Sequence, residues 1–140
     1  MPAFWIAIST AVIWGFVPLI EKLGLAKLDP MVGLFYRSIG VVIGLIILGL
    51  FMVKPDEIKS VDIKSALLVM TGGFLASFVA QILFYHALKA GEASRIVPIS
   101  GSYPLITFLL GIFIMGETLT PVKFAGVLLI VLGIWALNVG

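Results

Sequence analysis

Residues 31–53 read MVGLFYRSIGVVIGLIILGLFMV, a run of 23 residues in which Arg37 is the one charged side chain. At a rise of about 1.5 Å per residue, a helix of this length crosses a hydrocarbon core of about 30 Å. Four other stretches of the chain carry no formal charge over similar lengths, and they are Met1–Ile20, Ser65–Leu88, Ile96–Gly116 and Phe124–Gly140. We therefore predict an all-α membrane protein with five transmembrane helices.

The composition supports this fold class and excludes several others. Apolar residues make up 61% of the chain and charged residues 11%, which leaves too little polar surface for a soluble domain. The apolar runs do not alternate with polar residues as the strands of a β-barrel do. A net charge of +2 gives no footprint for nucleic acid, and the absence of cysteine excludes disulfides and thiol chemistry.

Helix boundaries can be placed from proline and capping residues. We expect one domain over residues 1–140, with helices at about residues 3–22, 30–53, 62–88, 94–116 and 121–139. Asp29-Pro30 and Thr120-Pro121 are each typical of an N-cap followed by proline at the first helical position. Pro98 and Pro104 both fall in the fourth helix, where each removes a backbone hydrogen bond, so we expect this helix to be kinked.

The basic residues are balanced between the two sides of the membrane. Membrane orientation normally follows an excess of Lys and Arg on the cytoplasmic side. Here the count is four against four, because one side holds Lys54, Lys59, Lys64 and Lys123 and the other holds Lys22, Lys27, Lys89 and Arg95. Either this is chance in a short chain, or the chain inserts in both directions and pairs as an antiparallel homodimer. We favour the second interpretation, since such a pair makes the inverted repeat of many secondary transporters.

Arg37 is the most costly residue to keep in the membrane, at about 2.5 kcal/mol or more on insertion scales. One interpretation is that it snorkels or pairs with backbone carbonyls and orients its helix. The other is that it faces an anionic group in a water-filled cavity. Several polar and aromatic side chains are expected at about the same depth, and these candidates for substrate binding, with Arg37, are Trp14, Gln81, Tyr85, Ser100 and Tyr103.

Two helices carry these polar groups as stripes. Gly73, Ser77, Gln81 and Tyr85 recur every four residues, and the fourth predicted helix has a similar stripe. Ordinary helix packing through small and hydroxyl residues would produce the same pattern. We prefer cavity lining for Tyr85, Tyr103 and Trp14. An antiparallel pair would bring two such layers together near the middle of the membrane.

The remaining candidates are helix-packing and titratable residues. Gly40 and Gly44 form a G-x-x-x-G pattern, which is typical of close helix packing. A proton relay needs a carboxylate or histidine in the membrane, and only Glu21 and His86 are candidates. Neither a catalytic constellation nor a metal-ligand spacing is present, so we expect no enzyme, no metal and no cofactor.

The order of these landmarks resembles one half of the EamA-like transporters in the drug/metabolite transporter superfamily. The resemblance covers nearly the whole chain. The matching residues are Trp14-Gly15, Lys22, Pro30, Arg37, the run Tyr85-His86-Ala87-Leu88-Lys89, Pro98, Pro104, Gly116-Glu117, Thr120, Gly126 and Gly133.

The resemblance implies a function and a mode of assembly. Most family members resemble ten-helix proteins made of two inverted five-helix halves, so this half is expected to pair, most simply with itself. The implied activity is transport of small metabolites or drugs, often amino acids, by alternating access across a cell membrane, expected to be a prokaryotic cytoplasmic membrane. Glu117 matches a family glutamate and is assigned, with Pro98, Pro104, Gly126 and Gly133, a structural or gating role. The alternatives are a non-transporting subunit that assembles with a different polypeptide, and a lipid flippase.

Overall fold

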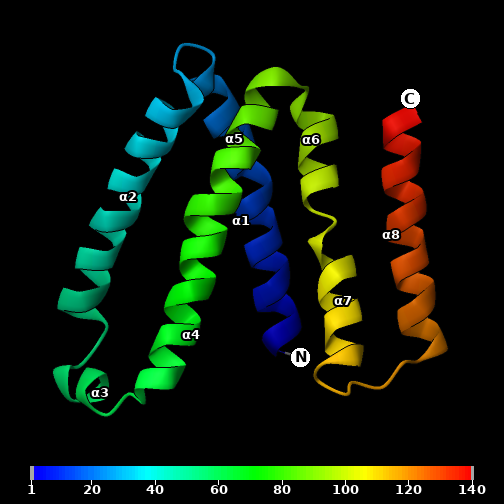
Figure 1. Ribbon diagram of the computed structural model, residues 1–140. Helices are drawn as coiled ribbons and strands as arrows, with labels where there is room; N and C mark the ends of the chain where they lie inside the picture. Colours follow the sequence, from blue (N-terminus) through cyan, green and yellow to red (C-terminus); the bar gives the residue numbers. More distant parts are fainter. Residues whose placement is uncertain (1, 140) are drawn as a thin grey trace. The chain divides into compact units, whose positions relative to one another are not determined.

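The computed structural model describes residues 2–139, which are entirely helical apart from turns and loops. The chain divides into two compact units at the boundary between Ala90 and Gly91. Unit 1 contains α1 (Pro2–Leu25), α2 (Pro30–Phe51), α3 (Pro55–Lys59), α4 (Ile63–Phe74), a π-helical turn η1 (Leu75–Val79) and α5 (Ala80–Ala90) (Figure 1). Unit 2 contains α6 (Ala93–Ser100), α7 (Tyr103–Phe113) and α8 (Pro121–Val139).

Four stretches are long and apolar enough to cross a membrane, and they are Pro2–Leu25, Pro30–Phe51, Ile63–Ala90 and Ala93–Phe113. The third is continuous through α4, η1 and α5. The fifth predicted span corresponds to α8, whose apolar part is the shorter stretch Pro121–Leu137. The all-α class of the prediction is therefore confirmed, with four full-length candidate spans and one shorter apolar helix.

The predicted capping residues do cap helices. The Asp29 carboxylate accepts a hydrogen bond from the Met31 backbone N–H at 2.9 Å, and Pro30 occupies the first turn of α2. The Thr120 hydroxyl accepts from the Lys123 N–H at 3.2 Å, at the start of α8. Each side chain satisfies a backbone donor that the first helical turn leaves without an intrahelical partner.

The fourth predicted helix is interrupted rather than only kinked. At the end of α6 the Gly101 N–H still makes an α-helical bond to the Val97 carbonyl at 2.7 Å, and the backbone then tightens, with the Ser102 N–H bonded to the Ile99 carbonyl three residues earlier at 3.1 Å. Pro104 has no N–H, and its ring crowds the carbonyl four residues earlier, so the α-helical ladder cannot run through this point. A new helix starts at Tyr103.

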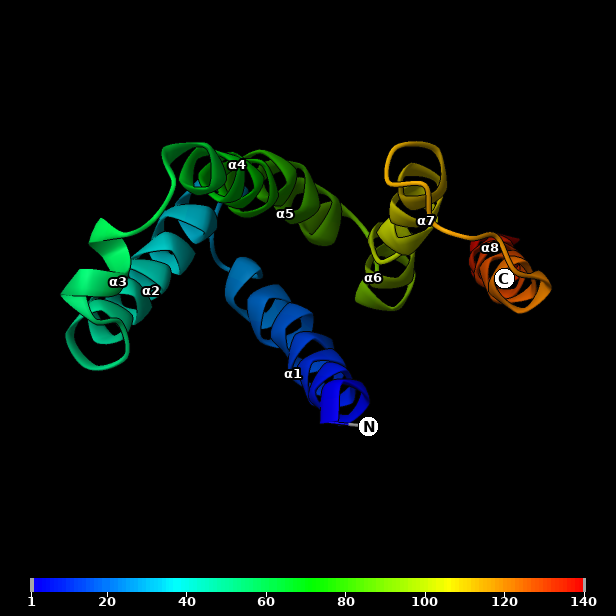
Figure 2. The ribbon, with the colours of Figure 1, turned by 90° about the horizontal axis from the view of Figure 1, so that it is seen from below.

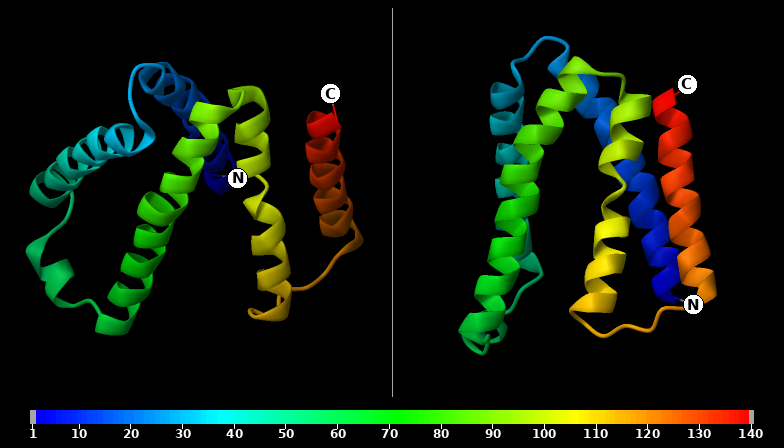
Figure 3. Two further views of the ribbon diagram at one scale, coloured as in Figure 1. Left: turned by 45° about the horizontal axis from the view of Figure 1, so that its top comes forward. Right: turned by 45° about the vertical axis from the view of Figure 1, so that its right-hand side comes forward.

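In unit 1, α1, α2 and α5 meet at the end where residues 26–29 join α1 to α2. Figure 2 shows α1 and α2 as two arms that come together at this turn, and Figures 1 and 3 show α2 separating from α4 toward the other end. The buried core side chains of the described residues all lie at this meeting point: Leu25, Leu34, Tyr85 and Leu88. Many large apolar side chains along the helices are exposed, as expected of lipid-facing helices.

Candidate functional site

A close contact at Gly33 holds the three helices together. A Cβ atom at this position would lie 2.6 Å from Leu25 Cδ2 on α1 and 3.3 Å from Tyr85 Cε2 on α5. Both neighbours are almost fully buried, with 2% and 3% of their surface exposed, so neither can move aside cheaply. Gly33 therefore lets α2 approach α1 and α5 more closely than any other residue would.

Two lysines tie α1 to α5 by crossing between their C-terminal ends. The Lys22 ammonium on α1 donates to the Leu88 carbonyl near the end of α5. The Lys89 ammonium on α5 donates to the Leu25 carbonyl at the end of α1 and to the Leu28 carbonyl, the latter at 3.0 Å. Helix C-termini carry unsatisfied carbonyls and partial negative charge, so each lysine caps the helix opposite its own.

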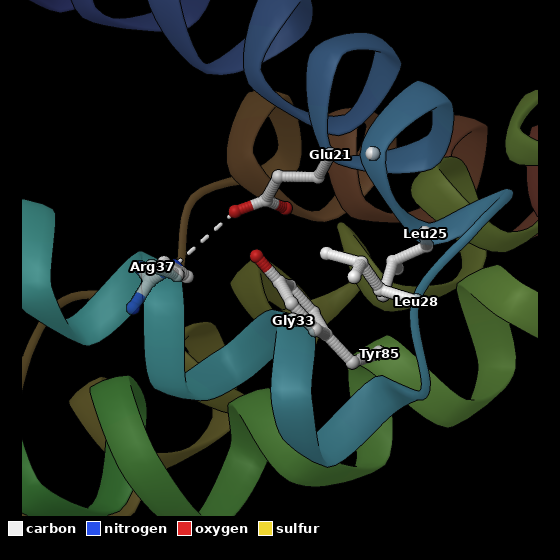
Figure 4. Close-up of a pocket in the computed structure, with 7 residues that line it drawn as sticks. Glu21, Leu25, Leu28, Gly33, Arg37 and Tyr85 are labelled. Atoms are coloured by element: carbon white, nitrogen blue, oxygen red, sulfur yellow. Dashed lines mark hydrogen bonds and ion pairs between the residues drawn. The ribbon is translucent and has the colours of Figure 1, made fainter.

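Arg37 forms an ion pair with Glu21 beside this contact. Arg37 Nε on α2 lies 3.2 Å from Glu21 Oε1 on α1, and the two side chains are 28% and 12% exposed. The Tyr85 hydroxyl on α5 points toward the same carboxylate (Figure 4). The site thus draws a cation, an anion and a phenol from three different helices.

These groups line an open pocket of about 240 Å³. Its polar wall is made of Glu21, Arg37 and Tyr85, and its remaining wall is small and apolar, formed by Gly24, Leu25, Leu28 and Gly33. Within residues 2–139, the Arg37 guanidinium makes one hydrogen bond, through Nε, so its two terminal nitrogens keep their donors. A guanidinium with free terminal N–H groups is suited to a carboxylate or phosphate.

Some predicted site residues come together in this pocket. Arg37 and Tyr85 were predicted to bind substrate, and Glu21 was a candidate for proton coupling; all three line it. Gln81 lies one helical turn before Tyr85 on the same helix and is not among the residues that line the pocket. Arg37, Glu21 and Tyr85 form one polar group.

Other predicted site residues lie elsewhere. Trp14 is on α1, 61% exposed and outside the pocket lining. His86 faces outward on α5, with its Nδ1 2.8 Å from the Ile82 carbonyl oxygen of the preceding turn. Ser100 ends α6 and Tyr103 begins α7, on either side of the helix interruption in unit 2.

The residues predicted to be structural differ in their surroundings. No atom lies within 4 Å of a Cβ built at Gly40, Gly44, Gly126 or Gly133, so within the described residues their helix faces are open. Glu117 instead has contacts in the loop after α7: its carboxylate packs 3.2 Å from a Cβ built at Gly111 and lies 3.7 Å from Lys123 Nζ. Pro98 is inside α6 and Pro104 is in the first turn of α7.

Sequence reasoning missed how Glu21 and Arg37 combine. Each was identified separately, but the partner of Arg37 was left open. The available signal was depth: Glu21 lies four residues before α1 ends and Arg37 seven after α2 begins, so both sit within about two turns of the same short connection. The close approach at Gly33 had no signal, because every glycine in an apolar run has the same appearance in the sequence.

Comparison with known proteins identifies the family. The profile of the EamA-like transporter family matches residues 1–139. The chain belongs to this family. It is therefore an integral membrane protein, and its family consists of transporters rather than enzymes.

Relatives of this EamA-like chain include proteins of two different lengths. An uncharacterized protein of Methanocaldococcus jannaschii is 31% identical over 140 residues, which cover 98% of this chain and 96% of that protein. The uncharacterized transporter YwfM of Bacillus subtilis is 36% identical over 66 residues, covering 47% of this chain and 22% of that transporter. An uncharacterized transporter of Archaeoglobus fulgidus is 21% identical over 114 residues, which cover 81% of this chain and 40% of that transporter. The chain thus spans less than half of both transporters, and no solved structure matches it.

Proposed function

We propose that the protein is a secondary transporter or exporter of small organic solutes that works by alternating access as an antiparallel homodimer. The observation that carries this proposal is the open pocket in which Arg37, Glu21 and Tyr85 meet. Charged groups inside a transmembrane helix pair are costly and mark substrate or ion pathways in most membrane proteins. We place the protein in the cytoplasmic membrane of a prokaryote, as its bacterial and archaeal relatives suggest.

The size and chemistry of the pocket favour a small zwitterion or carboxylate. The pocket measures about 240 Å³ and is open, which suits a small solute. The terminal nitrogens of Arg37 would bind a carboxylate, and Glu21 with Tyr85 would accept an ammonium group. A solute resembling an amino acid with a short apolar side chain has the carboxylate, the ammonium group and the small size that this pocket would accept.

The homodimer rests on two independent observations. Basic residues are balanced four against four between the two ends of the helices, which removes the usual determinant of a single orientation. In addition, the M. jannaschii relative matches this chain over nearly its whole length, so a family protein of half-transporter size exists. Two copies in opposite orientations would supply the ten helices and the inverted repeat of a transporter.

The other predicted residues have roles within this dimer. Trp14, Gln81, Ser100 and Tyr103 would complete the lining of the path. Glu21, and less directly His86, would couple transport to protons. The structural and gating positions are Gly40, Gly44, Pro98, Pro104, Glu117, Gly126 and Gly133.

Orientation can be measured with single cysteines, because the chain contains none. Ala26→Cys lies in the connection from α1 to α2, and Ser60→Cys lies in the connection that precedes α4, at the other end of α2. In intact cells, an impermeant thiol reagent should label about half of each variant if the chain inserts both ways. Complete labelling at one position and none at the other would exclude the antiparallel homodimer.

Transport can be tested in vesicles reconstituted with the purified protein. We would measure uptake of a panel of radiolabelled amino acids and small carboxylates by the native protein, Arg37→Ala and Arg37→Lys. Arg37→Ala should abolish uptake, and Arg37→Lys should retain part of it, because lysine keeps the charge but loses the two-point geometry. Native uptake by a correctly assembled Arg37→Ala dimer would exclude the role assigned to Arg37.

One observation favours a different function. Arg37 already has a partner in Glu21, as expected of an arginine whose role is structural. The protein would then be a non-transporting subunit that assembles with a different membrane polypeptide. Purification of a stable complex with such a polypeptide, and no uptake by the protein alone, would support this alternative; movement of a labelled phospholipid in the same vesicles would instead indicate a flippase.

A further inference from the structure

The helix that carries Tyr85 contains a π-helical turn at its centre. The turn η1 spans Leu75–Val79, near the middle of the 28-residue stretch Ile63–Ala90, and the Ala80 N–H bonds to the Leu75 carbonyl five residues earlier. A π turn holds one more residue than an α turn and costs stability, so such turns persist mostly at functional sites. Neither proline nor a special backbone angle within the described residues accounts for it here.

The extra residue changes which side chains share a face with Tyr85. In a regular α-helix each residue turns by about 100°, so a four-residue spacing overshoots a full turn by about 40°. From Gly73 through Ser77 and Gln81 to Tyr85, three such steps would spread the stripe over about 120°. One added residue takes up about 100° of this, which leaves a spread of about 20°.

Side-chain contacts on this helix agree with the calculation. Tyr85 lines the pocket and Gln81 lies one helical turn before it, so the stripe starts at the pocket. Phe74 and Phe78 stack on each other at a centroid distance of 5.2 Å and so occupy an adjacent face. In a regular helix, Phe78 rather than Ser77 would fall nearest the face of Tyr85, because two α turns span about seven residues.

The exposed Ser77 hydroxyl differs from several other hydroxyls in the spans, which bond to their own helix. Ser9, Thr10 and Thr71 each donate to the carbonyl four residues earlier. In the part of the chain that the structure describes, the Ser77 hydroxyl makes no hydrogen bond to protein. It therefore has donor and acceptor capacity left for another molecule.

We infer that the π turn positions Ser77 on the face of Tyr85, so that the solute site extends from the pocket past Gln81 to Ser77 at the centre of the membrane. This inference rests on the proposed function, in which the pocket receives the solute. Eight residues separate Ser77 from Tyr85, a distance of about 12 Å along the helix axis. The extension binds the polar part of a solute through hydroxyl and amide groups, and it connects the pocket to the midplane, where secondary transporters hold their substrates.

Cysteine reactivity tests the register without any knowledge of the substrate. Four single-cysteine variants, Ser77→Cys, Phe78→Cys, Gln81→Cys and Leu83→Cys, would be labelled in vesicles with a charged methanethiosulfonate reagent. The reactive thiolate forms in water and not in lipid, so Ser77→Cys and Gln81→Cys should react about tenfold faster than Phe78→Cys and Leu83→Cys. Faster labelling at position 78 than at position 77 would show a regular helix and overturn the inference.

A deletion then tests the π turn itself. Removing Ala76 converts the turn to an α turn, and the eight residues from position 77 to Tyr85 then place residue 77 about 80° away from the face of Tyr85. Labelling of Ser77→Cys should fall toward the level of Leu83→Cys, while Gln81→Cys, which lies beyond the π turn, keeps its rate. Unchanged labelling at both positions would overturn the inference; if the deleted protein does not assemble, the comparison of positions 77 and 78 in the full-length chain decides alone.

The same variants separate this inference from the proposed function. If positions 77 and 81 label fast but the protein moves no solute, the inference on the polar face stands and the transport proposal fails. If the protein transports solute but Ser77→Cys is not labelled, the transport proposal stands and the inference on Ser77 fails. The two proposals therefore fail on different measurements.

Discussion

Arg37 Nε lies 3.2 Å from Glu21 Oε1 and joins α2 to α1 at the wall of the pocket. The pair is neither fully buried nor on the open surface, since the arginine side chain is 28% exposed and the carboxylate 12%. Each charge compensates the other in a region where an isolated ion would be costly. The pair consequently joins the two helices of the hairpin, and in the proposed transporter it would also offer charge to a solute.

Breaking this pair should destabilise the protein measurably. We expect Arg37→Ala to lower the free energy of unfolding in detergent by about 2 kcal/mol, between the values for surface and buried pairs. The reversed pair Glu21→Arg with Arg37→Glu should recover part of this loss, whereas neither single reversal should. Chemical denaturation of the native protein, the two single reversals and the double reversal measures the coupling between the two side chains. If the effects of the two single reversals add up to that of the double reversal, the side chains do not interact.

The sequence predicts the helices of this protein much better than it predicts the site. Each helix follows from an apolar run long enough to cross the membrane and from caps such as Asp29 and Thr120, which act within a few residues. The pairing of Glu21 with Arg37 depends on how each helix is rotated about its own axis. An apolar run gives little information on this rotation, because any apolar face of a helix can contact lipid.

The two backbone irregularities differ in how far they could be predicted. The interruption before Pro104 is foreshadowed by a residue that cannot continue the hydrogen-bond ladder, although a kink was expected and a break is found. The π turn at Leu75–Val79 has no such residue. An extra residue in one turn does not change the composition of the helix. The only sign of it in the sequence is the spacing of four residues from Gly73 to Tyr85.

Gly33→Ala should be among the most damaging small substitutions in unit 1. The added methyl would lie 2.6 Å from Leu25 Cδ2, and because Leu25 is 2% exposed it has no free space to enter. We expect a loss of about 1–3 kcal/mol, typical of overpacking. Thermal unfolding in detergent would measure it.

Gly49→Ala is the matched control on the same helix. A Cβ at Gly49 has no atom within 4 Å, so alanine should be neutral or gain up to about 1 kcal/mol from its higher helix propensity. Equal effects at positions 33 and 49 would contradict a close contact at Gly33.

Lys89 should contribute to stability through the carbonyls it caps. Lys89→Met keeps the aliphatic stem but removes the donors to the Leu25 and Leu28 carbonyls, and we expect a loss of about 1–2 kcal/mol. Lys59→Met is the comparison, because Lys59 is 79% exposed and lies 3.9 Å from Asp56 on the surface, where ion pairs contribute about 0–1 kcal/mol. Unfolding in detergent that affects both variants equally would contradict the capping role.

Asp62 should make the start of α4 sensitive to acid. Its carboxylate accepts hydrogen bonds from the Ser65 backbone N–H at 2.9 Å and the Ser65 hydroxyl at 3.1 Å, and the backbone bond is the main reason that the pKa of Asp62 is lowered. Because this pKa is lower in the folded chain than in the unfolded chain, the cap contributes fully above the usual aspartate value of about 3.9. The contribution of the cap is then lost as the pH falls through the pKa of Asp62 in the folded chain.

Amide hydrogen exchange measures this loss. Exchange at Ser65 should accelerate, relative to the intrinsic rate, when the pH falls below that range. Asp62→Asn, which caps equally well without titrating, should show no such change. The same acceleration in Asp62→Asn would assign the acid sensitivity to another group.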